Sequence, residues 1–224
     1  VSFQAAEPIK AAIINFFAYY VSYWGLNRWY NQLLACLLAI ALLGFLFFFS
    51  NNLSTVIVLF CICAVIILSS VKKPDLYWYF LLGLALIIIA AIFVTVYLLM
   101  HQGAENFRFV RIRAWLHPEE YAADEGLQAM QARYAIGAGG FWGKGLGQSL
   151  IKFKLSYSYN DFILAIICEE LGVFGVIVMM TLFGYLLYRI YKIAQNAWDI
   201  EGKVLAIGVF TQIALQLLIN VMVV

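Results

Sequence analysis

Long apolar stretches separated by short polar ones dominate the pattern of this chain. Most of these stretches are close to the roughly 20 residues that an α-helix needs to cross a bilayer. The pattern predicts an all-α, polytopic membrane protein with about six transmembrane helices. The predicted helices are 9–24, 31–50, 53–71, 76–100, 161–190 and 204–224.

The fifth apolar stretch is too long for one straight crossing. Residues 161–189 contain no proline. As one helix they would span about 42 Å at 1.5 Å per residue, against a hydrocarbon core of about 30 Å. The polar sequence Glu-Glu-Leu-Gly at 169–172 interrupts this stretch. We predict a break there, with a short outer helix over 161–170 and the actual crossing over 172–190.

Composition supports a membrane protein and argues against several other classes. Hydrophobic residues make up 65% of the 224, far above the roughly 45–50% of soluble domains. The net charge of +2 is too small to indicate a nucleic-acid partner. The four cysteines lie in apolar stretches without ligand spacing, which favours packing roles over disulfides or metal sites. Because the chain starts at Val1 and ends in an apolar run, we expect a piece of a larger membrane domain.

The positions of the basic residues predict the orientation of the helices. One alternating topology places six lysines and arginines of short loops and helix ends on the same side, and these residues mark the cytoplasm. The segment 101–160 then forms a long extracytoplasmic loop. The six residues are Arg28, Lys72, Lys73, Arg189, Lys192 and Lys203.

The outer loop carries positive charge and a short helix. Its basic residues either keep the loop soluble or bind an anionic group such as a diphosphate. Gln128 and Gln131 share one face of a predicted helix that runs to Ile136. Loops of this length are usually functional. The seven basic residues are Arg108, Arg111, Arg113, Arg133, Lys144, Lys152 and Lys154.

Glycines cluster in the loop, in the sequence GAGGFWGKGLG at 137–147. This is no Walker loop, because Lys144 is followed by glycine instead of serine or threonine. No strand precedes it, which excludes a dinucleotide fingerprint. Two interpretations stay open: glycines that let the chain turn sharply near the membrane, and a backbone cradle for phosphate oxygens.

Several carboxylates lie at the edges of predicted helices. Asp161 is suited to be either a helix N-cap or a general base at the mouth of a membrane cavity. Glu169 and Glu170 point about 100° apart on a helix, so at most one faces a given cavity, and we expect one to pair with a basic group. Glu7 and Lys10, three residues apart, form either a modest structural ion pair or part of a cavity.

Two sequence blocks resemble a known family. FWGKGLGQSLIK at 141–152, followed by NDFILAIICEELG at 160–172, is similar to the signature of the SEDS (shape, elongation, division and sporulation) family, which includes FtsW and RodA. FQAAEPIK at 3–10 is similar to the family's FQPSE-x-x-K helix start. RIRAWLHPEE at 111–120, with Gln128 and Gln131, resembles its outer-loop entry. The resemblance implies the fourth to ninth of ten membrane helices and leans towards the FtsW branch.

The resemblance also implies an activity and its residues. SEDS proteins are peptidoglycan glycosyltransferases that polymerise lipid II on the outer face of the bacterial cytoplasmic membrane, together with a class B penicillin-binding transpeptidase of the divisome or elongasome. Asp161 takes the position of the essential aspartate, and other matched positions bind substrate. The substrate-binding residues are Lys152, Arg111, Lys144, Glu7, Lys10, Gln128 and Glu170.

The implied reaction predicts a single displacement at the anomeric carbon of the sugar. Asp161 would remove the acceptor proton, and Lys152 and Arg111 would neutralise the leaving diphosphate, with a divalent cation such as Mg²⁺ or Mn²⁺ as an optional cofactor. Two alternatives stay open. One is a flippase for the lipid-linked precursor, and the other is a scaffold that only activates the transpeptidase.

Overall fold

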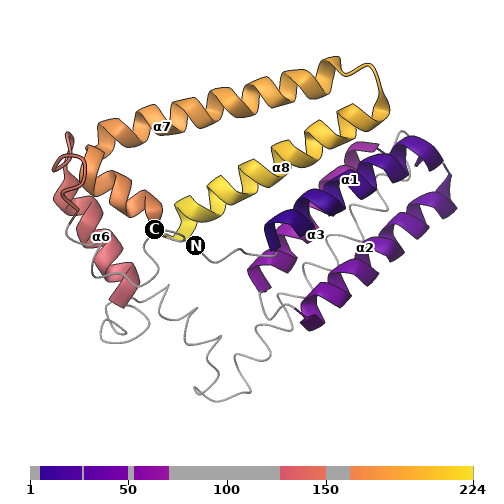
Figure 1. The fold of residues 1–224 in the computed structure, drawn as a ribbon, viewed down its shortest axis with the longest axis horizontal. Coiled ribbons are helices and arrows are strands. Elements are labelled where there is room, and N and C mark those ends of the chain that lie inside the picture. Colours follow the sequence, from indigo (N-terminus) through magenta and orange to yellow (C-terminus); the bar gives the residue numbers. More distant parts are fainter. Residues whose placement is uncertain (1–5, 27, 50–52, 71–126, 150–161, 224) are drawn as a thin grey trace. The chain divides into compact units, whose positions relative to one another are not determined.

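The computed structural model describes residues 6–26, 28–49, 53–70, 127–149 and 162–223, and every regular element in these ranges is an α-helix. The described part is therefore all-α, in agreement with the sequence pattern. Predicted helix 76–100 and most of loop 101–160, apart from 127–149, lie outside the described residues. The helices are α1 (Ala6–Trp24), α2 (Trp29–Phe49), α3 (Leu53–Ser70), α6 (Leu127–Gly139), α7 (Ile163–Asn196) and α8 (Ile200–Val223) (Figure 1).

Local chemistry explains why two of these helices begin before the predicted residue. Helix α1 starts at Ala6 instead of residue 9, because Pro8 falls in its first turn, where a missing backbone N–H costs nothing. Helix α8 starts at Ile200 instead of 204, since Oδ2 of Asp199 accepts a hydrogen bond of 2.8 Å from the backbone N–H of Gly202. Asp199 is thus the N-cap of α8.

The first compact unit contains helices α1, α2 and α3 together with residues 185–216. Helices α1 and α2 both pack on α3. The buried core consists of large apolar side chains such as Phe17, Leu59 and Ile66. The end of α7 and the start of α8 form an antiparallel hairpin, in which the rings of Tyr191 and Phe210 lie 6.2 Å apart (Figure 1).

The second compact unit contains helix α6, the glycine-rich loop that follows it, and α7 up to Gly184. Ala132 and Ala135 of α6 pack on Phe162 and Ala165, at the beginning of α7. Because three of these four residues are alanines, the backbones of α6 and α7 approach closely. Helix α6 therefore brings the loop to the place where α7 is interrupted.

Two of the described helices, α7 and α8, are long and apolar enough to cross a membrane by length and composition. Helices α2 and α3 contain shorter apolar segments, Tyr30–Leu46 and Thr55–Ser70. Many large apolar side chains of α7 are exposed, for example Ile177 and Leu182. Exposed apolar faces of this extent are typical of contact with lipid.

Candidate functional site

The interruption of α7 lies at Gly172, inside the 169–172 stretch where helix length predicts a break. Gly172 has a φ of 68° and a ψ of −172°, a conformation that essentially only glycine adopts. The ribbon of α7 turns sharply there and separates a short segment, 163–171, from a long one (Figure 1). The break leaves carbonyl groups at the end of the short segment and N–H groups at the start of the long one without intrahelical partners.

The glycine-rich loop supplies hydrogen bonds to both sides of this break. The backbone N–H groups of Lys144 and Gly145 donate to the carbonyl oxygens of Glu169 and Glu170, over 2.9 and 3.0 Å. In the other direction, the N–H groups of Val173 and Phe174 donate to the carbonyl oxygens of residues 140 and 141, over 3.1 and 3.2 Å. The loop thus replaces the helical bonds that Gly172 removes.

Glycine is required in this loop because the backbones come so close. A Cβ atom on Gly143 would collide with the carbonyl group of Glu170, and one on Gly139 would collide with the carbonyl group of Cys168. A Cβ atom on Gly172 would collide with the backbone of residues 141 and 143. Of the two interpretations of the glycines, the structure favours the sharp turn, since the N–H groups of residues 143, 144 and 145 already donate to backbone carbonyl oxygens.

A buried carboxylate joins the loop to the short segment of α7. The side chain of Glu169 is only 1% exposed. Its Oε1 lies 2.7 Å from Nζ of Lys144, and its Oε2 accepts a hydrogen bond of 2.6 Å from Oγ of Ser149. A buried charge is tolerated only when it is paired and hydrogen-bonded. Glu169 is therefore the glutamate that pairs with a basic group, and Lys144 is that group.

Glu170 has a different environment from its neighbour. Its Oε1 is buried without a hydrogen-bond partner among the described residues, while its backbone carbonyl accepts the bond from Gly145. The side chains of the two glutamates thus have different surroundings, as expected for adjacent positions on a helix. The assignment of Glu170 to substrate binding stays a prediction.

The residues predicted to do chemistry fall into two groups. Asp161, Lys152 and Arg111 lie outside the described residues, although helix α7 begins two positions after Asp161. Glu7 and Lys10 lie in the first turns of α1, where Lys10 is buried. Gln128 lies near the start of α6. The substrate-binding roles of these residues stay predictions, and Lys144 is engaged by Glu169.

The sequence analysis did not predict that Glu169 and Ser149 belong to one polar cluster. The helical periodicity of the sequence does indicate that Glu169 is buried. Phe162, Ala165, Ile166 and Glu169 follow the spacing i, i+3, i+4, i+7, and all four are buried. The periodic face therefore selects Glu169, not Glu170, as the inward-facing acid. No comparable pattern singles out Ser149.

Within the described ranges, no three histidine, cysteine, aspartate or glutamate side chains come together as metal ligands. The predicted cation would lie beside Asp161 and the diphosphate, outside these ranges. The Mg²⁺ or Mn²⁺ cofactor stays a prediction, and no step below depends on it.

Comparisons with known proteins identify relatives that match about half of the chain or slightly more. A segment of 130 residues is 43% identical to a probable peptidoglycan glycosyltransferase FtsW of Trichlorobacter lovleyi, covering 58% of this chain and 33% of that protein. The stage V sporulation protein E of Bacillus subtilis is 43% identical over 116 residues, which cover 51% of this chain and 32% of that protein. The matched segments thus span about a third of the length of these curated relatives.

A solved structure shares the fold. It bears the name "Structural coordination of polymerization and crosslinking by a peptidoglycan synthase complex", and it matches with a TM-score of 0.72 at 19% identity, over 100% of this chain and 60% of that one. The family model FtsW/RodA/SpoVE, described as "Cell cycle protein", matches residues 1–224. With the apolar helices, these matches identify a membrane protein, and the chain belongs to the FtsW/RodA/SpoVE, or SEDS, family.

Proposed function

We propose that the protein containing this chain polymerises lipid II into glycan strands, as a peptidoglycan glycosyltransferase for cell division or cell-shape maintenance. The observation that carries this proposal is the family match over residues 1–224, which includes the block around Asp161. Relatives named as probable peptidoglycan glycosyltransferases, at 43% and 38% identity, support it.

The proposed reaction is a single displacement at the anomeric carbon. The carboxylate of Asp161 takes the proton from the acceptor hydroxyl as that oxygen attacks, and the lipid diphosphate leaves from the opposite face of the sugar. Lys152 and Arg111 neutralise the negative charge that develops on the diphosphate. The products are a glycan longer by one disaccharide and a free lipid diphosphate.

The broken helix supports the roles proposed for Lys152 and Asp161, because residues that contact it lie next to both of them in the sequence. Ser149, held by Glu169, comes three residues before Lys152, and Phe162, packed on α6, directly follows Asp161. Ser149 and Phe162, which flank this stretch of sequence, are therefore both held by contacts within the same compact unit. We propose that this arrangement holds the catalytic segment at the outer membrane surface, with residues 172–190 crossing toward the cytoplasm.

A matched solved structure supports a transpeptidase as the partner of this protein. The matched solved structure is named as a peptidoglycan synthase complex that coordinates polymerization and crosslinking. We propose that this protein likewise acts beside a class B penicillin-binding transpeptidase, in the divisome or elongasome of the bacterial cytoplasmic membrane.

The test is a lipid II polymerisation assay on the full-length protein with its transpeptidase. Asp161→Asn should lower the polymerisation rate by at least about 100-fold, the low end of general-base contributions. Asp199→Asn is the matched control, because Asp199 caps α8 through an oxygen that asparagine retains. A normal rate in Asp161→Asn would show that the assignment of the base is wrong.

The same preparation distinguishes the two alternatives. A flippase would move lipid II between the leaflets of a vesicle without forming polymer. A scaffold would form no polymer but would raise the activity of the transpeptidase. Glycan strands made by the wild-type protein in detergent, where no second compartment exists, support the proposed polymerase over both.

A further inference from the structure

The tip of the glycine-rich loop exposes large apolar side chains. Phe141 is 56% exposed, Trp142 is 75% exposed and Leu146 is 78% exposed. The glycines and hydrogen bonds on the inner side of the loop fix its backbone against α7. The exposed side chains are therefore held in place by the fold. We name Phe141, Trp142 and Leu146 the apolar tip.

The apolar tip continues the exposed apolar face of α7. The ring of Trp142 lies 5.6 Å from the ring of Phe174, and the rings of Phe141 and Trp142 lie 5.2 Å apart. Phe174 is itself half exposed, and Ile177 and Val178, in the next turn of the helix, are exposed as well. In a membrane protein such a helix face contacts lipid, so the apolar tip borders a lipid-contacting surface.

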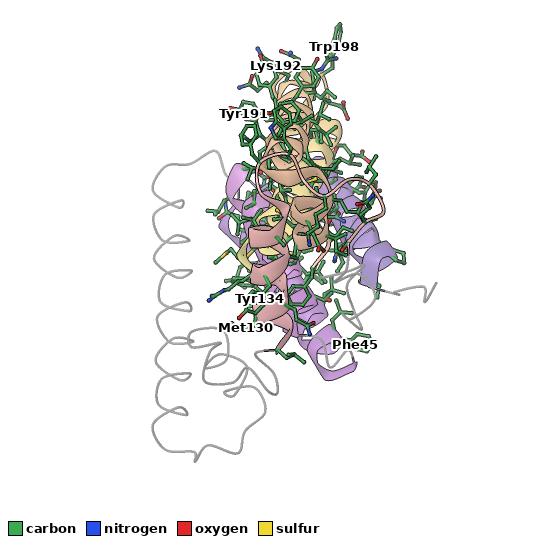
Figure 2. All side chains as sticks on the ribbon, turned by 90° about the vertical axis from the view of Figure 1, so that its left-hand side faces the viewer. Phe45, Met130, Tyr134, Tyr191, Lys192 and Trp198 are labelled. Atoms are coloured by element: carbon green, nitrogen blue, oxygen red, sulfur yellow. The ribbon has the colours of Figure 1, made fainter. Side chains whose placement is uncertain are left out.

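The opposite end of the long α7 segment has the residues of a membrane–water interface. Tyr185, Tyr188 and Tyr191 are exposed there. Nζ of Lys192 lies 5.7 Å from the centre of the Tyr188 ring, and Nη1 of Arg189 donates to the hydroxyl oxygen of Tyr185 over 3.3 Å. Figure 2 shows Tyr191 and Lys192 close to the turn that carries Trp198. Tyrosines with basic residues mark the headgroup level.

The spacing between the two ends matches the thickness of a bilayer. From Gly172 to Lys192 a helix rises about 30 Å at 1.5 Å per residue, which equals the usual thickness of the hydrocarbon core. With Lys192 at one headgroup layer, Gly172 lies at the other. The apolar tip, bonded to the helix at that point, then lies at the second interface, where tryptophan is enriched.

We propose that the apolar tip is a membrane anchor, with Phe141, Trp142 and Leu146 inserted into the interfacial layer of the lipid bilayer. This anchor sets the depth of the glycine-rich loop, and with it the depth of the Lys144–Glu169 ion pair and of Ser149. The inference concerns lipid contact and does not depend on the proposed glycosyltransferase activity.

The test measures the depth of the tip in the full-length protein, reconstituted in phosphatidylethanolamine–phosphatidylglycerol vesicles. p-Acetylphenylalanine is incorporated in place of Trp142 and carries a nitroxide, which leaves the native cysteines unchanged. Collision rates with oxygen, which is concentrated in lipid, and with a water-soluble nickel chelate give one ratio for each site. Position 177 provides the lipid-exposed reference, and position 148, where exposed Gln148 lies on the same loop, provides the matched polar control.

We expect an oxygen-to-nickel ratio at position 142 that approaches the ratio at position 177 and exceeds the ratio at position 148. A nickel-rich ratio like that of position 148 would place the tip in water and overturn the proposal. Exclusion of both reagents would show that a protein surface covers the tip, which also overturns it. If the protein labelled at position 142 does not fold, position 146 gives the same test with the same outcomes.

Discussion

The end of α1 and the end of the short α7 segment both leave backbone carbonyl groups without helical partners, but the chain satisfies them differently. At α1, Nδ2 of Asn31 donates to the carbonyl oxygens of Trp24 and Gly25 over 2.8 and 3.0 Å. Nε2 of Gln32 donates to that of Leu26 over 2.6 Å. Side chains of the next helix therefore close the end of α1.

At α7 the partners are backbone N–H groups of a loop, and glycines make the approach possible. A side-chain cap fails when its amide is removed, whereas a backbone cap fails when a Cβ atom is added. The comparison thus predicts opposite kinds of sensitive substitution in the two regions. Each such substitution should lower the free energy of unfolding, which thermal or denaturant unfolding of the full-length protein in detergent micelles measures.

The largest effect should come from Gly172→Ala. Alanine at the observed φ and ψ costs about 1–3 kcal/mol in backbone strain. The overlap of its Cβ atom with the backbone of the loop costs about 1–3 kcal/mol more. We expect a loss of about 4 kcal/mol. Gly184→Ala is the control, because Gly184 is helical with open space at its Cβ position, and it should be neutral or stabilising. Equal stability of the two variants would contradict the backbone cap.

Lys144→Met should cost somewhat less. The substitution leaves the carboxylate of Glu169 buried without its ammonium partner, a change that costs roughly 3–5 kcal/mol in buried pairs. We expect about 3 kcal/mol, because the Lys144 side chain is 31% exposed and water reaches it.

A double-mutant cycle separates the ion pair from other effects of this change. Glu169→Gln removes the buried charge, so Lys144→Met should cost much less in that background. Lys203→Met, at an exposed lysine, controls for the loss of one positive charge. An unchanged cost of Lys144→Met in the Glu169→Gln background would show that the pair does not hold the loop.

Asn31→Ala tests the side-chain cap at the end of α1. It removes both bonds to the carbonyl oxygens of Trp24 and Gly25 at a buried position. We expect a loss of about 2 kcal/mol, within the usual penalty for unsatisfied buried groups. Gln195→Ala, at an exposed helical amide, should change stability by no more than about 0.5 kcal/mol. If both variants behaved alike, the amide of Asn31 would not be a cap.

Tyr20→Phe should have the smallest effect. The hydroxyl group of Tyr20 donates to the backbone carbonyl oxygen of Asn31 over 3.1 Å, next to the side-chain cap. Loss of one such bond costs about 1 kcal/mol. Tyr134→Phe, on an exposed ring of α6, is the control and should leave the unfolding midpoint unchanged (Figure 2). A larger effect at Tyr134 than at Tyr20 would argue against this hydrogen bond.

The two regions also differ in how far their sequences predict them. Apolar run length predicts all-α architecture and places helices near α1, α2, α3, α7 and α8, because lipid requires long apolar helices. Helix length and the polar stretch at 169–172 predict the break. The partner of the broken ends could not be predicted, because the bonds of Lys144 and Gly145 come from backbone amides, which every residue carries.

The side chains of the predicted site also differ in how far the sequence predicts their roles. The pairing of one glutamate with a basic group follows from the cost of a buried charge. The identity of that glutamate requires the helical phase set by Phe162 and Ala165, which packing against α6 establishes. The roles of Asp161, Lys152 and Arg111 rest on family resemblance, because the chemistry of single side chains in a long loop has no periodic signal.

The bonds between the glycine-rich loop and the break in α7 join residues that are near one another along the chain. Lys144 and Glu169 are 25 positions apart, and Ser149 and Glu169 are 20 positions apart. Once the ribosome has added Phe174 to the growing chain, every group in this arrangement has been synthesised. The polar ends of the interrupted helix can therefore find their partners before α8 has been synthesised. The loop that these contacts close is only 25 residues long, so its closure costs less entropy than contacts between helices distant in the sequence.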